Sequence, residues 1–207
     1  MAEAYRIKGK YRWKDEDQRD DKLTKLVSVL RHHAGYRVDS VLKREHYEQF
    51  VRGKLPPMID DPYFICFYNV VLSACHLLNK IQAVGTVDWI FDEQGKIGRE
   101  AVEWYYWVRE HAPPKVRARL GVTPTFRDDN EILPLKAADM FAWQIRRHLN
   151  EEQPKGKTHG DALDTLMQMY GVSCRFRSED LSGLVQSGGV LLKADCGFHI
   201  PPSVVLQ

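Results

Sequence analysis

The 207-residue sequence has no hydrophobic run long enough to cross a membrane. Its longest apolar stretch, Tyr63 to Leu78, is interrupted by Asn69, Ser73 and His76, whereas a spanning helix needs about 20 predominantly apolar residues. The opening residues, MAEAYRIKGK, also lack the apolar segment of a signal peptide. We therefore expect a cytoplasmic protein with no membrane partner, in which the apolar stretch forms a buried helix.

Cysteine is scarce, and its spacing carries no metal-binding pattern. The four cysteines, at positions 66, 75, 174 and 196, include no CxxC pair and have no histidine at zinc-finger spacing. The sequence therefore predicts neither a structural zinc site nor a disulfide framework.

Common catalytic signatures are missing as well. There is no G-x-S-x-G elbow, Walker loop or G-x-G-x-x-G, and the GKIG at 95–98 is too short for a phosphate loop and is read as a tight connection. The histidines at 32, 33, 46, 76 and 111 show no ligand spacing relative to one another. The net charge of +2 is too small to indicate nucleic-acid binding by itself.

The residues that are present have the composition of an ordinary globular protein, with 43% hydrophobic and 28% charged side chains. Periodicity predicts helices over 16–35, 43–52, 62–81, 99–111, 134–149, 162–170 and 181–186, and strands over 36–42, 86–91, 122–126 and 174–177. Strands that alternate with helices favour an α/β architecture with a largely buried sheet.

A polar segment, EEQPKGKTHG at 151–160, marks the expected domain boundary. We expect one domain over residues 1–153. Residues 154–207 are expected to form a linker and a small C-terminal α/β extension.

Carboxylates follow the ends of two predicted strands. Asp92 and Glu93 close the strand at 86–91, and Asp128 and Asp129 close the next one. Ligand sites of open α/β sheets lie outside the carboxyl ends of the strands, and hard cations such as Mg²⁺ or Mn²⁺ take oxygen ligands. The alternative interpretation is a pair of solvated acidic strand ends, which are common.

Asp139 lies in the helix predicted at 134–149, about 100° from the first member of its apolar stripe. That stripe comprises Ala138, Phe141, Ala142, Ile145 and Leu149. The helix dipole does not account for a carboxylate beyond the first turn. The candidate partners of the Asp139 carboxylate are Arg146, Trp143 or Arg147 further along the helix, a metal ion, or water. When this helix is considered alone, a solvated or paired carboxylate is the favoured interpretation.

Two segments, IFDEQGKIG at 90–98 and TPTFRDDNEILPLKAADMFAWQIRRHL at 123–149, resemble the domain-of-unknown-function 3800 family. Its members carry an "FDE"-like strand end, an "FRDD" turn and a "PLQAAD" helix, and the resemblance covers about residues 5 to 150. It implies a ribonuclease H-like fold, with a mixed sheet flanked by helices, and acidic residues that bind divalent metal. The matching positions are Asp92, Glu93, Asp128 and Asp139.

The sequence departs from this family in two places. Lys136 replaces a glutamine and puts a positive charge one turn before Asp139. The opening strand with its "DES-G" or "DET-G" motif is missing before Glu16. Either the chain begins at an internal methionine and lacks that strand, or it is a non-catalytic relative, or residues 4–8 supply a substitute. We favour the first explanation, because a parallel sheet without its middle strand leaves unpaired backbone groups.

We therefore expect a metal-dependent, nuclease-like protein that hydrolyses phosphodiesters. Asp92, Glu93 and Asp139 are the candidate catalytic residues, and the same three together with Asp128 are the candidate ligands of Mg²⁺ or Mn²⁺. The phosphates of a nucleic-acid partner are assigned to Arg127, Arg146 and Arg147. The alternative is a non-catalytic or truncated relative that acts as a binding or regulatory protein. The sequence indicates no oligomeric state.

Overall fold

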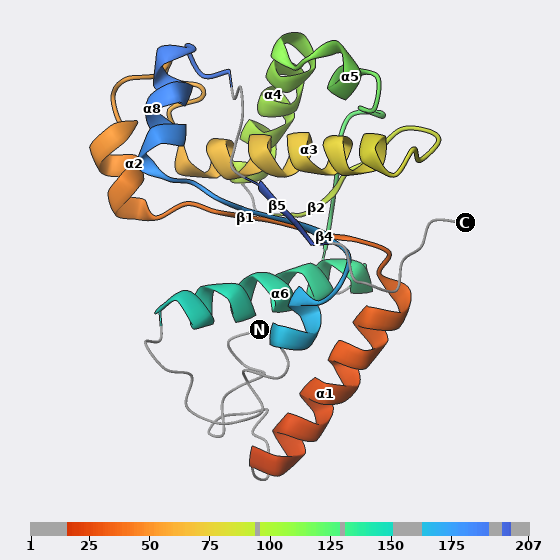
Figure 1. The fold of residues 1–207 in the computed structure, drawn as a ribbon. Coiled ribbons are helices and arrows are strands. Elements are labelled where there is room, and N and C mark those ends of the chain that lie inside the picture. The colour runs from red at the N-terminus through yellow and green to blue at the C-terminus, as the bar shows by residue number, and fades with distance from the viewer. Residues whose placement is uncertain (1–15, 94–95, 129–130, 151–162, 191–195, 200–207) are drawn as a thin grey trace. The chain divides into compact units, whose positions relative to one another are not determined.

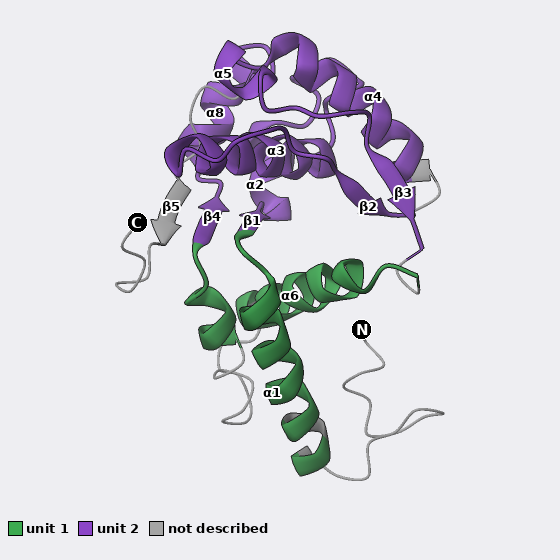
Figure 2. Ribbon diagram, turned by 90° about the vertical axis from the view of Figure 1, so that its right-hand side faces the viewer, with its two compact units in different colours: residues 1–37, 129–170, 199–207 green, residues 38–128, 171–198 purple. Residues whose placement is uncertain are grey.

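The computed structural model describes residues 16–93, 96–128, 131–150, 163–190 and 196–199. The chain divides into two compact units (Figure 2). Unit 1 comprises residues 1–37, 129–170 and 199–207, and unit 2 comprises residues 38–128 and 171–198. The boundary expected at residue 153 and the substitute strand considered for residues 4–8 lie outside the described residues, and both stay predictions.

Helices and strands alternate along the chain (Figure 1), which confirms the predicted mixed α/β class. In chain order the elements are α1 (Glu16–His33), β1 (Arg37–Val41), α2 (Arg44–Phe50), α3 (Pro62–Lys80), β2 (Ile90–Asp92), α4 (Lys96–His111), α5 (Pro114–Arg117), β3 (Thr125–Arg127), α6 (Leu133–Asn150), β4 (Gly171–Arg175), α8 (Ser178–Gln186) and β5 (Cys196–His199). A short helical segment, 163–167, precedes β4. The strand β5 was not predicted. No helix among the described residues combines the length and apolarity needed to cross a membrane.

The strands form two small sheets. One has the order β1-β4-β5, and the other pairs β2 with β3 in parallel. At the ends of the β1–β4 pair, Arg37 N donates to Tyr170 O (3.0 Å) and Phe176 N donates to Val41 O (3.1 Å), so these two strands also run in the same direction. Parallel neighbours need long crossover connections, which the intervening helices supply.

The strand β2 is shorter than predicted and ends one residue later. Regular pairing begins only at Ile90, and Val87 meets Leu120 in an isolated bridge. Between them, Asp88 Oδ1 accepts a hydrogen bond from Val122 N (3.3 Å). A side chain therefore takes the place of a backbone acceptor there and interrupts the ladder.

The core of unit 2 is built around α3, which confirms the buried helix predicted from the apolar stretch. Asp61 caps this helix by accepting from Tyr63 N (2.7 Å), and Pro62 occupies its first turn, where no amide donor is needed. The Phe64 ring meets the Trp104 and Trp107 rings of α4 edge-on, at centroid distances of 5.9 and 5.3 Å. Such aromatic contacts are among the most stabilising in a core.

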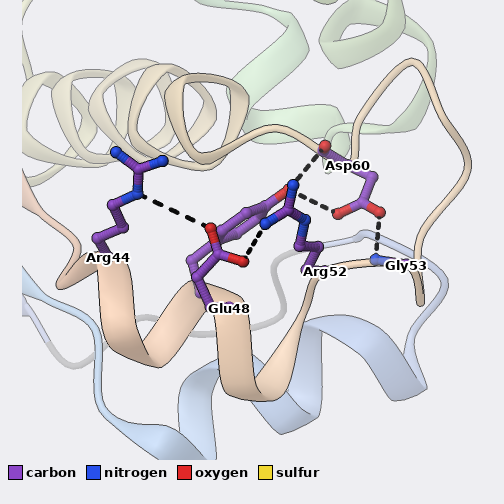
Figure 3. Close-up of polar contacts among 6 residues, drawn as sticks. Arg44, Glu48, Arg52, Gly53 and Asp60 are labelled. Atoms are coloured by element: carbon purple, nitrogen blue, oxygen red, sulfur yellow. Dashed lines mark hydrogen bonds and ion pairs between the residues drawn. The ribbon is translucent and has the colours of Figure 1, made fainter.

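A polar cluster holds the chain between α2 and α3 (Figure 3). The Tyr47 hydroxyl lies 2.9 Å from Asp60 O and 3.0 Å from Asp60 Oδ1, and Gly53 N donates to Asp60 Oδ2 (2.6 Å). Glycine suits this turn because its φ is +74°. On the adjoining surface of α2, Glu48 lies between Arg44 and Arg52, the latter donating to its carboxylate.

The core of unit 1 joins α1, α6 and the segment 163–167. Its buried members are Leu23, Val27, Met140, Leu166 and Met169. Arg37 Nη2 donates to Met167 O (2.9 Å), and its guanidinium lies 6.0 Å from the centre of the Phe141 ring.

The apolar stripe predicted for α6 is partly wrong. Ala138, Ala142 and Leu149 are exposed, whereas Met140 and Gln144 are buried. The buried face is therefore rotated by about 100°, the angle of one residue step. Asp139 consequently lies on the exposed side of the helix rather than at the border of the core.

One cysteine differs from the sequence expectation. Cys174 of β4 is disulfide-bonded, although its spacing from the other cysteines indicated no such bond. Cys66 and Cys75 on α3 are free thiols.

Candidate functional site

The carboxyl ends of β2 and β3 bring four predicted site residues to one edge of the two-stranded sheet. Asp92 pairs in register with Arg127, and Glu93 N donates to Arg127 O (3.0 Å), so the ladder extends one residue past β2. Asp128 follows directly after β3. We call Asp92, Glu93, Arg127 and Asp128 the strand-end edge. All four side chains are exposed.

The two faces of this strand pair differ in chemistry. Phe91 and Phe126 stack at a centroid distance of 5.9 Å; Phe126 packs against the core of unit 2, and the Phe91 ring lies 5.4 Å from that of Phe67 on α3. The opposite face carries Ile90 with Thr125, then Asp92 with Arg127, all exposed. Successive side chains of a strand point to opposite faces, so Asp92 lies beside a cation.

The same alternation separates the two adjacent acidic residues of β2. Continued by one residue, the alternation would place Glu93 on the face of Phe91 and opposite Asp128, and the hydrogen bond from Glu93 N to Arg127 O (3.0 Å) supports this extension of the register. The pair of carboxylates most suited to sharing one ion is therefore Glu93 with Asp128. Asp92 lies on the other face with Arg127.

The prediction of GKIG at 95–98 as a tight connection is partly wrong, because its residues from Lys96 onward belong to α4. The helix α4 begins at Lys96, only three residues after Glu93. A Cβ added at Gly98 would lie 3.4 Å from Phe126 Cδ1, so the first turn of α4 packs closely on the β3 side chain. An alanine at position 98 would make ordinary van der Waals contact with the Phe126 ring, which shows how closely the helix approaches β3.

The donor set of the edge suits a hard divalent cation. Carboxylate oxygens are the preferred ligands of Mg²⁺, which commonly binds through one or two carboxylates and completes its shell with water and substrate phosphates. Within the described ranges, no three His, Cys, Asp or Glu side chains are grouped closely enough to hold a metal ion together. The edge residues therefore fit a site in which two carboxylates bind the cation and substrate phosphates and water complete its coordination shell.

The remaining predicted site residues lie on α6, in unit 1. Asp139 and Lys136 are both exposed and are three residues apart, which makes them neighbours on a helix surface. Arg146 is exposed. The Arg147 guanidinium lies 5.2 Å from the centre of the Trp143 ring, a cation–π contact within the helix. The predicted residues thus fall into two groups, one at the strand-end edge and one on α6.

A buried carboxylate on β1 was missed by the sequence reasoning. Asp39 is 7% exposed, and its Oδ1 accepts a hydrogen bond from Ser173 Oγ of β4 (2.7 Å). Charged residues are rarely this buried. An acidic residue inside the alternating pattern of 36–42 was the signal that could have identified it.

We compared the chain with models of known protein families, with curated proteins and with solved structures, and none matches it. The resemblance to the domain-of-unknown-function 3800 family therefore rests on the residues quoted for it.

Proposed function

We propose that this protein is a ribonuclease H-like, metal-dependent hydrolase of phosphodiester bonds whose ion is held at the strand-end edge. The supporting observation is the parallel register of β2 and β3, which brings their carboxyl ends side by side. The family resemblance of the same residues supports the choice of reaction.

Each residue of the edge has a proposed role. Glu93 and Asp128, on one face, hold the ion. Arg127 binds a phosphate of the substrate, because a guanidinium offers paired donors to phosphate oxygens, and Asp92 beside it orients that guanidinium. A bound Mg²⁺ or Mn²⁺ supplies Lewis-acid activation of water and neutralises charge on the phosphate.

For the residues on α6, which lie in unit 1, the proposal rests on the family resemblance alone. Asp139 remains the proposed further catalytic carboxylate, and Arg146 and Arg147 remain the proposed phosphate contacts along the substrate.

The test is cleavage of a labelled single-stranded oligonucleotide with Mn²⁺ or Mg²⁺, compared with EDTA. We expect metal-dependent cleavage that falls at least about 100-fold in Glu93→Gln and in Asp128→Asn, since loss of a ligand removes both affinity and orientation. Glu103→Gln is the matched control, because Glu103 is an exposed carboxylate on α4. Its activity should equal that of the wild type.

Two results would overturn the proposal. One is cleavage that persists unchanged in both Glu93→Gln and Asp128→Asn. The other is the absence of cleavage of RNA and DNA strands under every metal condition by a protein that unfolds cooperatively.

A non-catalytic binding protein is the second candidate, and one observation favours it. Asp92 has Arg127 beside it in register, and Asp139 has Lys136 one helical turn before it. An internal cation near each carboxylate takes over part of the charge compensation that an ion would provide. This alternative predicts oligonucleotide binding in EDTA without cleavage after Mn²⁺ is added.

A further inference from the structure

A groove of about 680 Å³ opens on unit 2 where the end of α3 meets the start of α5. The residues that line it are His76, Asn79, Lys80, Pro113, Pro114 and Lys115. They include two lysines and a histidine, and none of these described lining residues is a carboxylate. The groove therefore combines cationic side chains with the apolar rings of two prolines.

Hydrogen bonds join the two walls of the groove. Asn79 Nδ2 donates to Lys115 O (3.2 Å), while Asn79 Oδ1 accepts from Arg119 Nε (2.6 Å). Arg119 Nη1 also donates to Gly85 O (2.9 Å). Pro113 and Pro114 fix their own φ angles, so the wall that carries Lys115 is held before any ligand arrives.

The end of α3 would repel an anion if its last carbonyl groups were open, because they carry the negative end of the helix dipole. Three of these carbonyl oxygens instead accept hydrogen bonds from backbone amides that follow the helix. Leu77 O, Leu78 O and Asn79 O accept from the backbone amides of Ile81 (3.0 Å), Ala83 (2.9 Å) and Gln82 (3.2 Å). Lys80 and Lys115 are the lysines of the groove lining.

His76 adds a neutral polar group. Partial burial lowers the pKa of its imidazole, so near pH 7 the ring is mainly uncharged and offers one donor and one acceptor.

We propose that this groove binds a single strand of nucleic acid, with phosphates on Lys80 and Lys115 and a sugar and base against Pro113 and Pro114. Such a strand alternates anionic and apolar surface, as the groove does. Single-strand sites generally pair a cationic groove with aromatic side chains on which bases stack, and here the rings of Pro113 and Pro114 provide the apolar surface instead. The choice of ligand rests on the proposed function, in which a phosphodiester strand is the substrate. The groove is linked through the Asn79–Arg119 hydrogen bond to the segment of the Val87–Leu120 bridge, and its lining includes no residue of the strand-end edge.

The test measures binding without hydrolysis. Fluorescence anisotropy follows a labelled oligothymidine of about 12 nucleotides, within the range of single-strand site sizes, titrated in EDTA over several salt concentrations. The double variant Lys80→Glu with Lys115→Glu should bind at least about 10-fold more weakly. The slope of log K against log salt should fall by about 1.4, since each phosphate contact on a single strand contributes about 0.7.

The matched control is the double variant Lys22→Glu with Lys43→Glu, because both lysines are exposed and lie outside the groove. It changes the net charge equally and should alter affinity by less than about twofold. Thermal unfolding checks that each variant is folded. If the groove double variant is destabilised, Lys115→Glu alone should still weaken binding and lower the slope by about 0.7.

Three outcomes would overturn the inference: no binding by the wild type, equal weakening in the two double variants, or equal affinity for a poly-glutamate peptide of similar charge, which would point to an acidic protein partner. Because EDTA removes metal-dependent cleavage, a protein that binds through the groove but never cleaves would refute only the proposed function. Cleavage that persists unchanged in the groove variants, with unchanged binding, would refute only the groove.

Discussion

Asp92 of β2 and Arg127 of β3 occupy opposed positions in a parallel strand pair, and both side chains are exposed. Opposed residues of neighbouring strands are separated by about 4.8 Å between backbones, so the two side chains leave the same face of the strand pair as neighbours. The strand-end edge therefore carries its own cation. Any divalent ion that binds there competes with a guanidinium for the same negative potential.

The first prediction concerns this competition. Arg127→Gln should tighten Mn²⁺ binding by about sevenfold at low salt, because a unit charge about 7 Å from a divalent ion in water contributes about 1.2 kcal/mol. The same variant should cleave oligonucleotides more slowly, since the proposed phosphate contact is lost. A titration followed by the spectroscopic signal of free Mn²⁺ measures the affinity.

Arg117→Gln is the control for that titration, because Arg117 is an exposed arginine of α5 in the same unit. It should leave Mn²⁺ affinity unchanged. If Arg127→Gln weakened Mn²⁺ binding or left it unaltered, the ion would not lie at the strand-end edge.

The second prediction separates a chemical from a structural role for Asp139. Asp139→Asn should abolish metal-dependent cleavage while shifting stability by no more than about 0.5 kcal/mol, because the residue is exposed. Cleavage assays and thermal unfolding of the same preparation give both readings. Asp164→Asn changes an exposed carboxylate of the same unit and should affect neither. Normal cleavage by Asp139→Asn would remove this residue from the site.

Much of the fold followed from local sequence signals. The helix α3 begins and ends close to its predicted bounds, because the Asp61–Pro62 cap and a long, predominantly apolar run are readable from the chain. The pairing of β1 with β4 and the existence of β5 were not predictable in this way. The β1–β4 pairing depends on contacts between residues more than 100 positions apart, as in the Ser173–Asp39 hydrogen bond, and β5 depends on pairing with β4; periodicity encodes neither.

The candidate site was predictable only in its residue types and its location. Acidic residues after two parallel strands indicated an edge, and the register brings them to one. Which face each carboxylate takes depends on where the strand ends. A register shift of a single residue would move every side chain of the strand to the opposite face. The start of β2 follows the hydrogen bond from Val122 N to the Asp88 side chain, and no sequence pattern predicted that contact.

The third prediction concerns the pH dependence of stability. Burial, followed by the hydrogen bond and charge of Asp60, raises the pKa of Tyr47 to about 12. The folded protein therefore keeps this proton where an unfolded chain, with a tyrosine pKa near 10, would lose it. The resulting contribution to stability is complete below pH 10 and is lost as the pH rises from 10 to 12.

In Tyr47→Phe this loss between pH 10 and 12 should be smaller, and the variant should be less stable near pH 7 by about 1 kcal/mol for the missing hydrogen bond. Urea unfolding at stepped pH values measures both effects. Tyr63→Phe is the control, since Tyr63 is exposed, and it should follow the wild-type curve. An identical pH curve for Tyr47→Phe would contradict the role of the Tyr47–Asp60 contact.

The fourth prediction tests the polar link between α3 and β1. Asn69 is 2% exposed, its Nδ2 donates to Ser40 Oγ of β1 (3.0 Å), and its Oδ1 accepts from Ser73 Oγ (3.4 Å). Asn69→Ala removes both bonds and leaves a cavity, so it should cost about 2–3 kcal/mol. For a protein of this length, each kcal/mol lowers the Tm by about 2–4 °C.

A double-mutant cycle distinguishes the hydrogen bond from the cavity. Ser40→Ala should cost about 1 kcal/mol by itself, because it deprives a buried amide of its acceptor. Combined with Asn69→Ala it should add much less, since that donor is then already gone, and the resulting coupling energy should be about 0.5–1.5 kcal/mol. Urea unfolding of the four proteins provides the cycle. A coupling near zero would mean that Asn69 contributes only by filling space, and that apolar packing alone joins α3 to β1.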